Sequence, residues 1–149
     1  TLALHPSETE LRLMARVIAF ILNANDDLAF CKGISEDDEP DLWEKDLDGS
    51  MKLWIDLGQP DEKRIKKACG RSNRVIIYTY QENMAEPWFK QIQNNINRFK
   101  NLSIIHLNIE ESIENFAKRS MVLQCNISDE ELTLINDNED LIITHKKWN

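Results

Sequence analysis

The chain has 149 residues, of which 42% are hydrophobic and 30% charged, and this is enough apolar material for one folded domain. Its net charge of −8 argues against binding to nucleic acid over a broad basic face, because phosphate neutralisation dominates such binding. The three cysteines show neither a disulfide framework nor a zinc pattern, so we expect a reduced, cytoplasmic protein. No apolar run reaches the roughly 18 residues that span a bilayer, which predicts no membrane insertion.

The first half of the chain predicts two helices with strands between them. Ser7 and Glu10 form a capping box, and apolar residues recur behind them at helical spacing, so we expect a helix that ends between residues 23 and 27. Next come a short strand at 28–32, an ordered polar loop at 33–49 and a strand at 51–57. Pro60 suits the first turn of the helix that follows.

The second half predicts alternating strands and helices and then a run of strands. The expected elements are a strand at 74–80, a helix opened by Pro87, a strand at 102–107, a helix at 109–120, and short strands at 121–127, 132–135 and 141–145. The alternation predicts an α/β fold in which helices cover both faces of a mixed sheet. The turn-separated strands at the end predict an antiparallel C-terminal meander.

A single acid stands inside an apolar strand at Asp56. Strand alternation puts Trp54 and Asp56 on one face of the sheet and Ile55 and Leu57 on the other. A buried carboxylate is costly, so it is better placed at a strand end that faces a cleft, where a cation can share its charge. The cation could be a metal ion; the alternatives are an exposed sheet edge or an ion pair with a lysine.

An acidic run precedes this strand at residues 36–41. Mg²⁺ favours one or two carboxylates together with waters and substrate oxygens, and Asp38 or Glu39 beside Asp56 would meet that need. The same run also suits an exposed turn, since acidic loop segments are commonly solvated.

Two lysines follow on the next predicted helix. Lys66 or Lys67 could hold a phosphate or stabilise negative charge that develops on it. Adjacent helical residues point about 100° apart, so we expect only one of the two to face a site. The alternative is that both serve the helix dipole. Glu8 is a first-turn acid of the first helix, a position that the dipole favours by itself.

Four blocks of sequence stand out. They are HPSET at 5–9, DDEP at 37–40, LWIDLG at 53–58 and PDEKRIKKAC at 60–69. Together they resemble the YaeQ family of bacterial proteins, and a looser match continues through 78–80, 101–103 and 121–124. The family is similar in fold to the restriction-endonuclease-like superfamily, which is marked by a PD-(D/E)xK metal site. The resemblance therefore implies a central mixed sheet flanked by helices.

The resemblance also implies a set of site residues. Carried onto this sequence, the metal-binding acids would be Asp38 or Glu39 and Asp56, with Glu8 or Glu10 as a further acid on the first helix. The pattern departs at Gly58, which stands where the superfamily has its lysine. The lysine function could then move to Lys66 or Lys67 on the next helix, a variation seen elsewhere in the superfamily.

Two functions follow as expectations. The first is a Mg²⁺- or Mn²⁺-dependent phosphodiesterase of the nuclease type, in which Asp38, Glu39 and Asp56 hold the metal and Lys66, Lys67 and Glu8 assist catalysis. The second is a non-catalytic regulatory protein on the same fold that binds nucleic acid or a protein. We expect one domain over 1–149. Family members also usually carry a β segment before the HPSET block that is missing here, which would leave a sheet edge unpaired.

Overall fold

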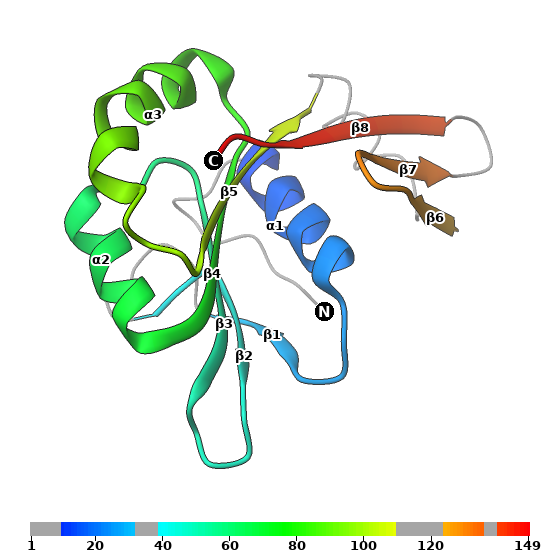
Figure 1. The fold of residues 1–149 in the computed structure, drawn as a ribbon. Helices are drawn as coiled ribbons and strands as arrows, with labels where there is room; N and C mark the ends of the chain where they lie inside the picture. The colour runs from blue at the N-terminus through cyan, green and yellow to red at the C-terminus, as the bar shows by residue number, and fades with distance from the viewer. Residues whose placement is uncertain (1–9, 32–38, 110–123, 136–139) are drawn as a thin grey trace.

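The computed structural model describes residues 10–31, 39–109, 124–135 and 140–149, and it places eight strands in one mixed sheet (Figure 1). The strands are β1 (Leu28–Phe30), β2 (Leu42–Lys45), β3 (Met51–Leu57), β4 (Ser72–Thr79), β5 (Leu102–Asn108), β6 (Gln124–Ile127), β7 (Glu131–Ile135) and β8 (Asp140–Lys147). Their order in the sheet is β1-β2-β3-β4-β5-β8-β7-β6. Strands β3, β4 and β5 are parallel, and the other neighbours pair antiparallel.

Helices pack on both faces of this sheet. They are α1 (Glu10–Asn23), α2 (Glu62–Arg71) and α3 (Glu82–Ile96). The apolar residues of α1 pack with Leu53, Ile55 and Leu57, whereas α2 and α3 pack with Trp54 on the opposite face. Figure 1 shows the same separation, with α1 on one side of the central strands and α2 and α3 on the other. The predicted mixed sheet with helices on both faces is confirmed, as is the alternation along β3.

Three boundary predictions are wrong. The loop expected over 33–49 contains β2, which pairs antiparallel with β3 through a turn whose Gly49 has a positive φ of 87°. Helix α3 begins at Glu82, so Pro87 lies inside it. Pro60 precedes the N-cap of α2, Asp61, instead of standing in its first turn. Pairing with β3 outweighs the loop preference at β2, packing of buried residues holds α3 around Pro87, and the Asp61 cap sets the start of α2.

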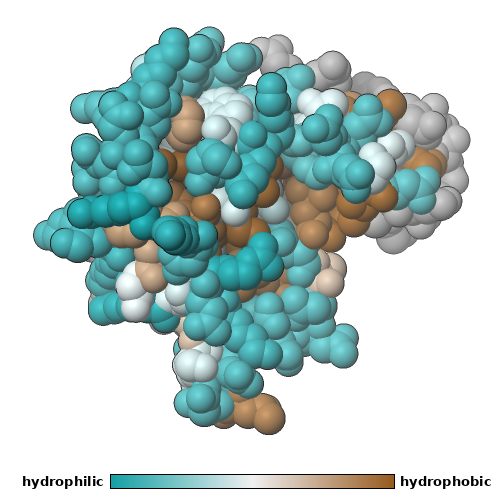
Figure 2. Space-filling view, viewed as in Figure 1, coloured by the Kyte–Doolittle hydropathy of each residue, from teal (hydrophilic) through white to brown (hydrophobic). Residues whose placement is uncertain are grey.

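The other predicted strands are present where the structure describes them, although the ends of several differ from the expected bounds by one or two residues. Strand β3 has the predicted bounds, and the C-terminal strands form an antiparallel meander that joins the main sheet through β8 and β5. The capping residue Ser7 and the helix expected at 109–120, apart from Ile109, lie outside the described residues. The tip of the β2–β3 hairpin carries the fully exposed Leu47, and Figure 2 shows an apolar spot at this tip.

Candidate functional site: two buried aspartates at the end of β3

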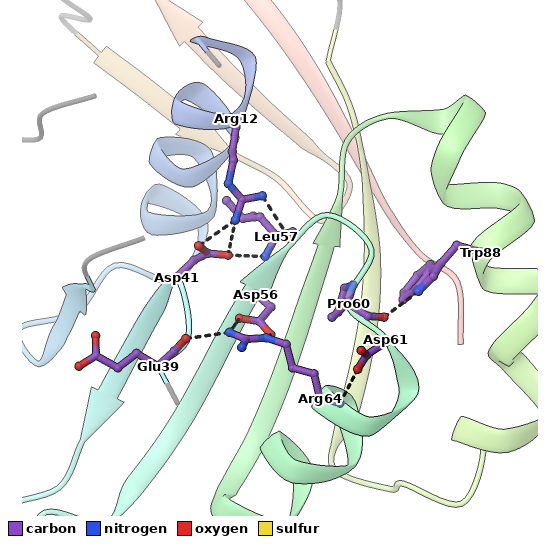
Figure 3. A network of polar contacts seen from close by, with 9 residues as sticks. All are labelled: Arg12, Glu39, Asp41, Asp56, Leu57, Pro60, Asp61, Arg64 and Trp88. Carbon is purple, nitrogen blue, oxygen red and sulfur yellow. Dashed lines mark hydrogen bonds and ion pairs between the residues drawn. The ribbon is translucent and has the colours of Figure 1, made fainter. Parts of the chain in front are cut away.

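Asp56 lies near the carboxyl end of β3 and is only 3% exposed. Its carboxylate receives a two-point contact from the guanidinium of Arg64, with Nε 2.8 Å from Oδ2 and Nη2 3.1 Å from Oδ1 (Figure 3). A buried carboxylate without a partner costs several kcal/mol, roughly 3–5 when one member of a buried pair is removed. The cation that shares the charge of Asp56 is therefore an arginine from the next helix.

Arg64 is positioned by the start of α2. The carboxylate of the N-cap residue Asp61 accepts a hydrogen bond from the backbone N–H of Arg64 at 2.8 Å, which fixes the first turn beside the end of β3. Nη2 of Arg64 also donates to the backbone carbonyl of Glu39 at 2.7 Å, and the guanidinium carbon lies 5.5 Å from the centre of the Trp54 ring. One side chain thus joins α2, β3 and the segment that leads into β2.

A second aspartate–arginine pair lies beside the first. Nη2 of Arg12, on α1, contacts both carboxylate oxygens of Asp41, at 2.9 and 3.0 Å, and Nη1 donates to the carbonyl of Leu57 at 3.3 Å. The N–H of Leu57 donates to Oδ2 of Asp41 at 2.8 Å, and Asp41 is 4% exposed. The network therefore passes around the end of β3, from α1 on one face of the sheet to α2 on the other (Figure 3).

The charge of Asp56 affects the pKa of Asp41. Burial raises the pKa of Asp41, the charge of Arg12 opposes that rise, and the charge of Asp56 adds to it. Burial alone would lower the pKa of Arg12, but Asp41 raises it above its ordinary value. The site is thus a pair of neighbouring buried carboxylates, each neutralised by its own guanidinium.

The residues predicted for the site are only partly brought together. Asp38 and Glu8 lie outside the described residues, and Glu10 is the first residue of α1. Glu39 contributes its backbone carbonyl to Arg64, while its side chain runs away from Asp56 in Figure 3. The acid that the structure places next to Asp56 is Asp41.

The two candidate lysines lie in different surroundings on α2. Lys66 is exposed, whereas Lys67 is half-buried and lines a surface hollow of about 300 Å³. Asp61, Lys63 and Arg64 line the rest of this hollow. Since Arg64 also contacts Asp56, the hollow adjoins the carboxylate pair on its α2 side.

Sequence reasoning missed Asp41 and Arg12. A signal for Asp41 was present, because Pro40 and Asp41 form a Pro-Asp dipeptide immediately before β2, and the pattern of the superfamily that the sequence blocks suggest begins with the same two residue types. Arg12 gave no such signal, since an arginine on an amphipathic helix is ordinarily solvated. Gly58 has a φ of +93° and donates its N–H to the carbonyl of Tyr78 at 2.9 Å, so a lysine at this position would be strained.

The carboxylate oxygens of the site are ligands that a hard divalent cation prefers, but their negative charges are already paired with arginine. Mg²⁺ and Mn²⁺ prefer carboxylate oxygens, and Asp41 and Asp56 offer them side by side. Across the described ranges, no group of three acidic, histidine or cysteine side chains is arranged to hold a metal. Both carboxylates already carry a guanidinium, so a metal ion fits here only if it replaces one of them.

Fold and site together define an α/β protein with two paired, buried aspartates at one end of its mixed sheet. A family model described as YaeQ protein matches residues 1–145. The chain therefore belongs to the YaeQ family, as its sequence blocks predict.

Relatives and solved structures agree with this assignment. The chain is 40% identical to the "Uncharacterized protein YaeQ" of Escherichia coli strain K12, a match that covers 99% of this chain and 83% of that protein. The corresponding protein of Salmonella typhi is 39% identical, with the same coverage.

Two crystal structures of YaeQ proteins resemble the present one. That from Xanthomonas axonopodis pv. citri has a TM-score of 0.89 and 41% identity, covering 98% of this chain and 84% of the other. That from Pseudomonas syringae has a TM-score of 0.84 and 29% identity, covering 97% and 81%. None of the helices in the described part of this chain has the length and apolarity needed to cross a bilayer.

Proposed function

We propose that this protein is a divalent-metal-dependent phosphodiesterase of the nuclease type, with Asp41 and Asp56 as its metal-binding acids. The observation that carries the proposal is the placement of two neighbouring buried carboxylates beside a hollow lined by Lys63, Arg64 and Lys67. A phosphodiester group needs both parts: a metal ion held by carboxylates and cations that bind its non-bridging oxygens.

Each residue has a distinct role in this proposal. Asp41 and Asp56 would hold Mg²⁺ or Mn²⁺, which when bound would polarise the phosphoryl oxygen and activate a water molecule. Lys67 supplies the amine that Gly58 cannot, because it lines the hollow while Lys66 is exposed. The mixed sheet flanked by helices, with Pro40 and Asp41 before β2, also agrees with a PD-(D/E)xK site.

The test is a comparison of Asp56→Asn with the wild type. Isothermal titration with Mn²⁺ is expected to show saturable binding to the wild type and none to Asp56→Asn, because the neutral amide cannot share the charge of the metal ion. Cleavage of labelled single-stranded and duplex DNA and RNA in Mn²⁺ is expected to disappear in the same variant.

Asp46→Asn, on the exposed turn of the β2–β3 hairpin, is the matched control and should bind and cleave as the wild type does. Cleavage that continues unchanged in Asp56→Asn would reject the assignment, and so would a wild-type protein that takes up no Mn²⁺. Circular dichroism of each variant shows whether its fold is retained.

One observation favours a second candidate, a non-catalytic protein that binds nucleic acid or another protein. Both aspartates are already neutralised by arginine, and Gly58 stands where a catalytic lysine is expected. This candidate predicts no cleavage with any divalent ion, together with saturable binding of an unmodified partner. Metal-dependent cleavage that Asp56→Asn removes would exclude it.

A further inference from the structure

We infer that Arg64 is an exchangeable counter-ion: its guanidinium neutralises Asp56 until a divalent cation takes its place, and it then turns into the adjoining hollow to bind a phosphate group. This inference rests on the proposed function, because it requires Asp56 to bind metal. Arg64 would then have two successive partners, first the carboxylate of Asp56 and afterwards an anionic substrate.

Exclusion between metal and arginine follows from the contacts at Asp56. Both carboxylate oxygens accept hydrogen bonds from Arg64, at 2.8 and 3.1 Å, and the Asp56 side chain is 5% exposed. A metal ion on the same oxygens would lie within about 4 Å of the guanidinium, where like charges in a poorly solvated site repel strongly. One of the two cations must therefore leave.

Arg64 is the arginine better placed to leave. Its side chain is 26% exposed and lines the hollow with Lys63 and Lys67, whereas the side chain of Arg12 is 16% exposed and lines no such hollow among those described. Each guanidinium also donates to one backbone carbonyl, that of Glu39 for Arg64 and that of Leu57 for Arg12. The backbone of Arg64 is fixed separately by the Asp61 cap, so the exchange is a rotation of the side chain that breaks its contacts with Asp56 and with the carbonyl of Glu39.

The released guanidinium suits a phosphate group. Arginine binds phosphate oxygens at two points, as it binds a carboxylate, and the hollow already contains the ammonium-bearing side chains of Lys63 and Lys67. Departure of Arg64 also removes the donor from the Glu39 carbonyl, so metal uptake would loosen the contact between α2 and the segment before β2. Metal binding thereby prepares the site for its substrate.

The test compares Arg64→Gln with the wild type and uses the metal alone as probe. If Mn²⁺ must displace the guanidinium, Arg64→Gln is expected to bind Mn²⁺ at least about tenfold more tightly, since charge-assisted hydrogen bonds no longer compete. Lys66→Gln is the charge-matched control: it removes one positive charge from the same helix without touching Asp56, so its Mn²⁺ affinity should change much less. Isothermal titration measures all three.

Thermal unfolding gives a second readout. In EDTA, Arg64→Gln is expected to melt below the wild type because Asp56 loses its counter-ion, and saturating Mn²⁺ should raise its Tm by more than it raises that of the wild type. Arg64→Lys keeps the positive charge but cannot form the two-point contact with Asp56, so its Mn²⁺ affinity should lie between those of the wild type and Arg64→Gln. This variant provides the test if Arg64→Gln does not fold.

Two failures can be told apart. Equal Mn²⁺ affinity in the wild type, Arg64→Lys and Arg64→Gln would overturn the exchange while leaving the metal site intact. Absence of Mn²⁺ binding in every variant, with a low Tm of Arg64→Gln that Mn²⁺ does not raise, would overturn the proposed function as well and assign Arg64 a purely structural role.

Discussion

Asp41 and Asp56 meet at the end of β3, and the pKa of Asp41 depends on the charge of Asp56. The electrostatic origin of this coupling is simple: both groups are buried, and a second negative charge nearby makes a first one harder to hold. The two guanidinium groups compensate for the burial, because each aspartate forms an ion pair with one arginine.

This coupling predicts a pKa shift that can be measured. Asp56→Asn removes the neighbouring negative charge, so the raised pKa of Asp41 should fall. Carboxyl-carbon NMR titration of the wild type and the variant measures it, and an unchanged or higher pKa would contradict the coupling. Because this pKa is raised in the folded state, the contribution of Asp41 to the free energy of unfolding falls as the pH rises through it.

Gly58 gives a second prediction, which concerns the backbone. Its φ of +93° disfavours any side chain, although among the described residues a Cβ there would meet only Nη1 of Arg12, at an ordinary 3.5 Å. Gly58→Ala should therefore lower the free energy of unfolding by about 1 kcal/mol or more. Gly70→Ala is the matched control: it lies within α2 with open space around it and should stabilise by up to about 1 kcal/mol. Urea unfolding separates the two, and a loss in both would contradict this reasoning.

At the residue scale, the sequence indicates the unusual acid of the site but not the side chains that pair with it. An unusual acid inside an apolar strand was recognisable at Asp56, and its burial with a cationic partner follows from elementary electrostatics. The identity of that partner was not recognisable, because Arg64 and Arg12 reach the end of β3 from helices on opposite faces of the sheet. Only the three-dimensional arrangement of those helices decides which arginine meets which aspartate.

Some helices and strands could likewise be predicted from the sequence, and others could not. Strand β3 and the C-terminal strands could be predicted from periodicity and turn residues, since their patterns are local. Strand β2 could not, because its four residues are stabilised mainly by pairing with β3. Pro87 misled for a related reason: the helix around it is held by packing of Ala85 and Ile92, which outweighs the hydrogen bond that proline removes.

The junction of β4, β5 and the end of the chain contains a half-buried histidine. His106, on β5, lies 2.8 Å through Nδ1 from the hydroxyl of Thr79 and stacks on Trp148, with ring centres 4.9 Å apart. Burial lowers the pKa of His106 below its ordinary 6.5, and the charge of Glu82 opposes that change.

This junction predicts a pH dependence of stability. Because the pKa of His106 is lowered in the folded state, the unfolded chain takes up a proton at higher pH than the folded protein does. The contribution of His106 to the free energy of unfolding is therefore complete above about pH 6.5 and is lost as the pH falls below that value. Urea unfolding at pH 7.5 and 5.5 should show a smaller difference for His106→Gln than for the wild type. An equal difference in both would assign the effect to other groups.

At the scale of the whole molecule, the sheet has two regions with different neighbours. Strands β3, β4 and β5 pack against α1 on one face and against α2 and α3 on the other, and the aspartate site lies at the end of β3. Strands β8 and β7 extend the sheet beyond β5 and add buried residues to the core on the α1 face (Figure 1). The fold class was predictable because alternating strands and helices have few compact solutions. The position of the site was not, since it depends on how helices from both faces approach one strand end.

The place of β8 in the sheet sets an order for biosynthesis. Strands β6 and β7 are synthesised before β8, yet they attach to β5 only through it, with Ile105 paired to Lys147 and Leu132 to Ile143. The hairpin of β6 and β7 is therefore synthesised before the strand that joins it to β5. The elements that carry the two aspartate–arginine pairs, from α1 to α2, come earlier still, so all four side chains leave the ribosome before β8 can pair with β5.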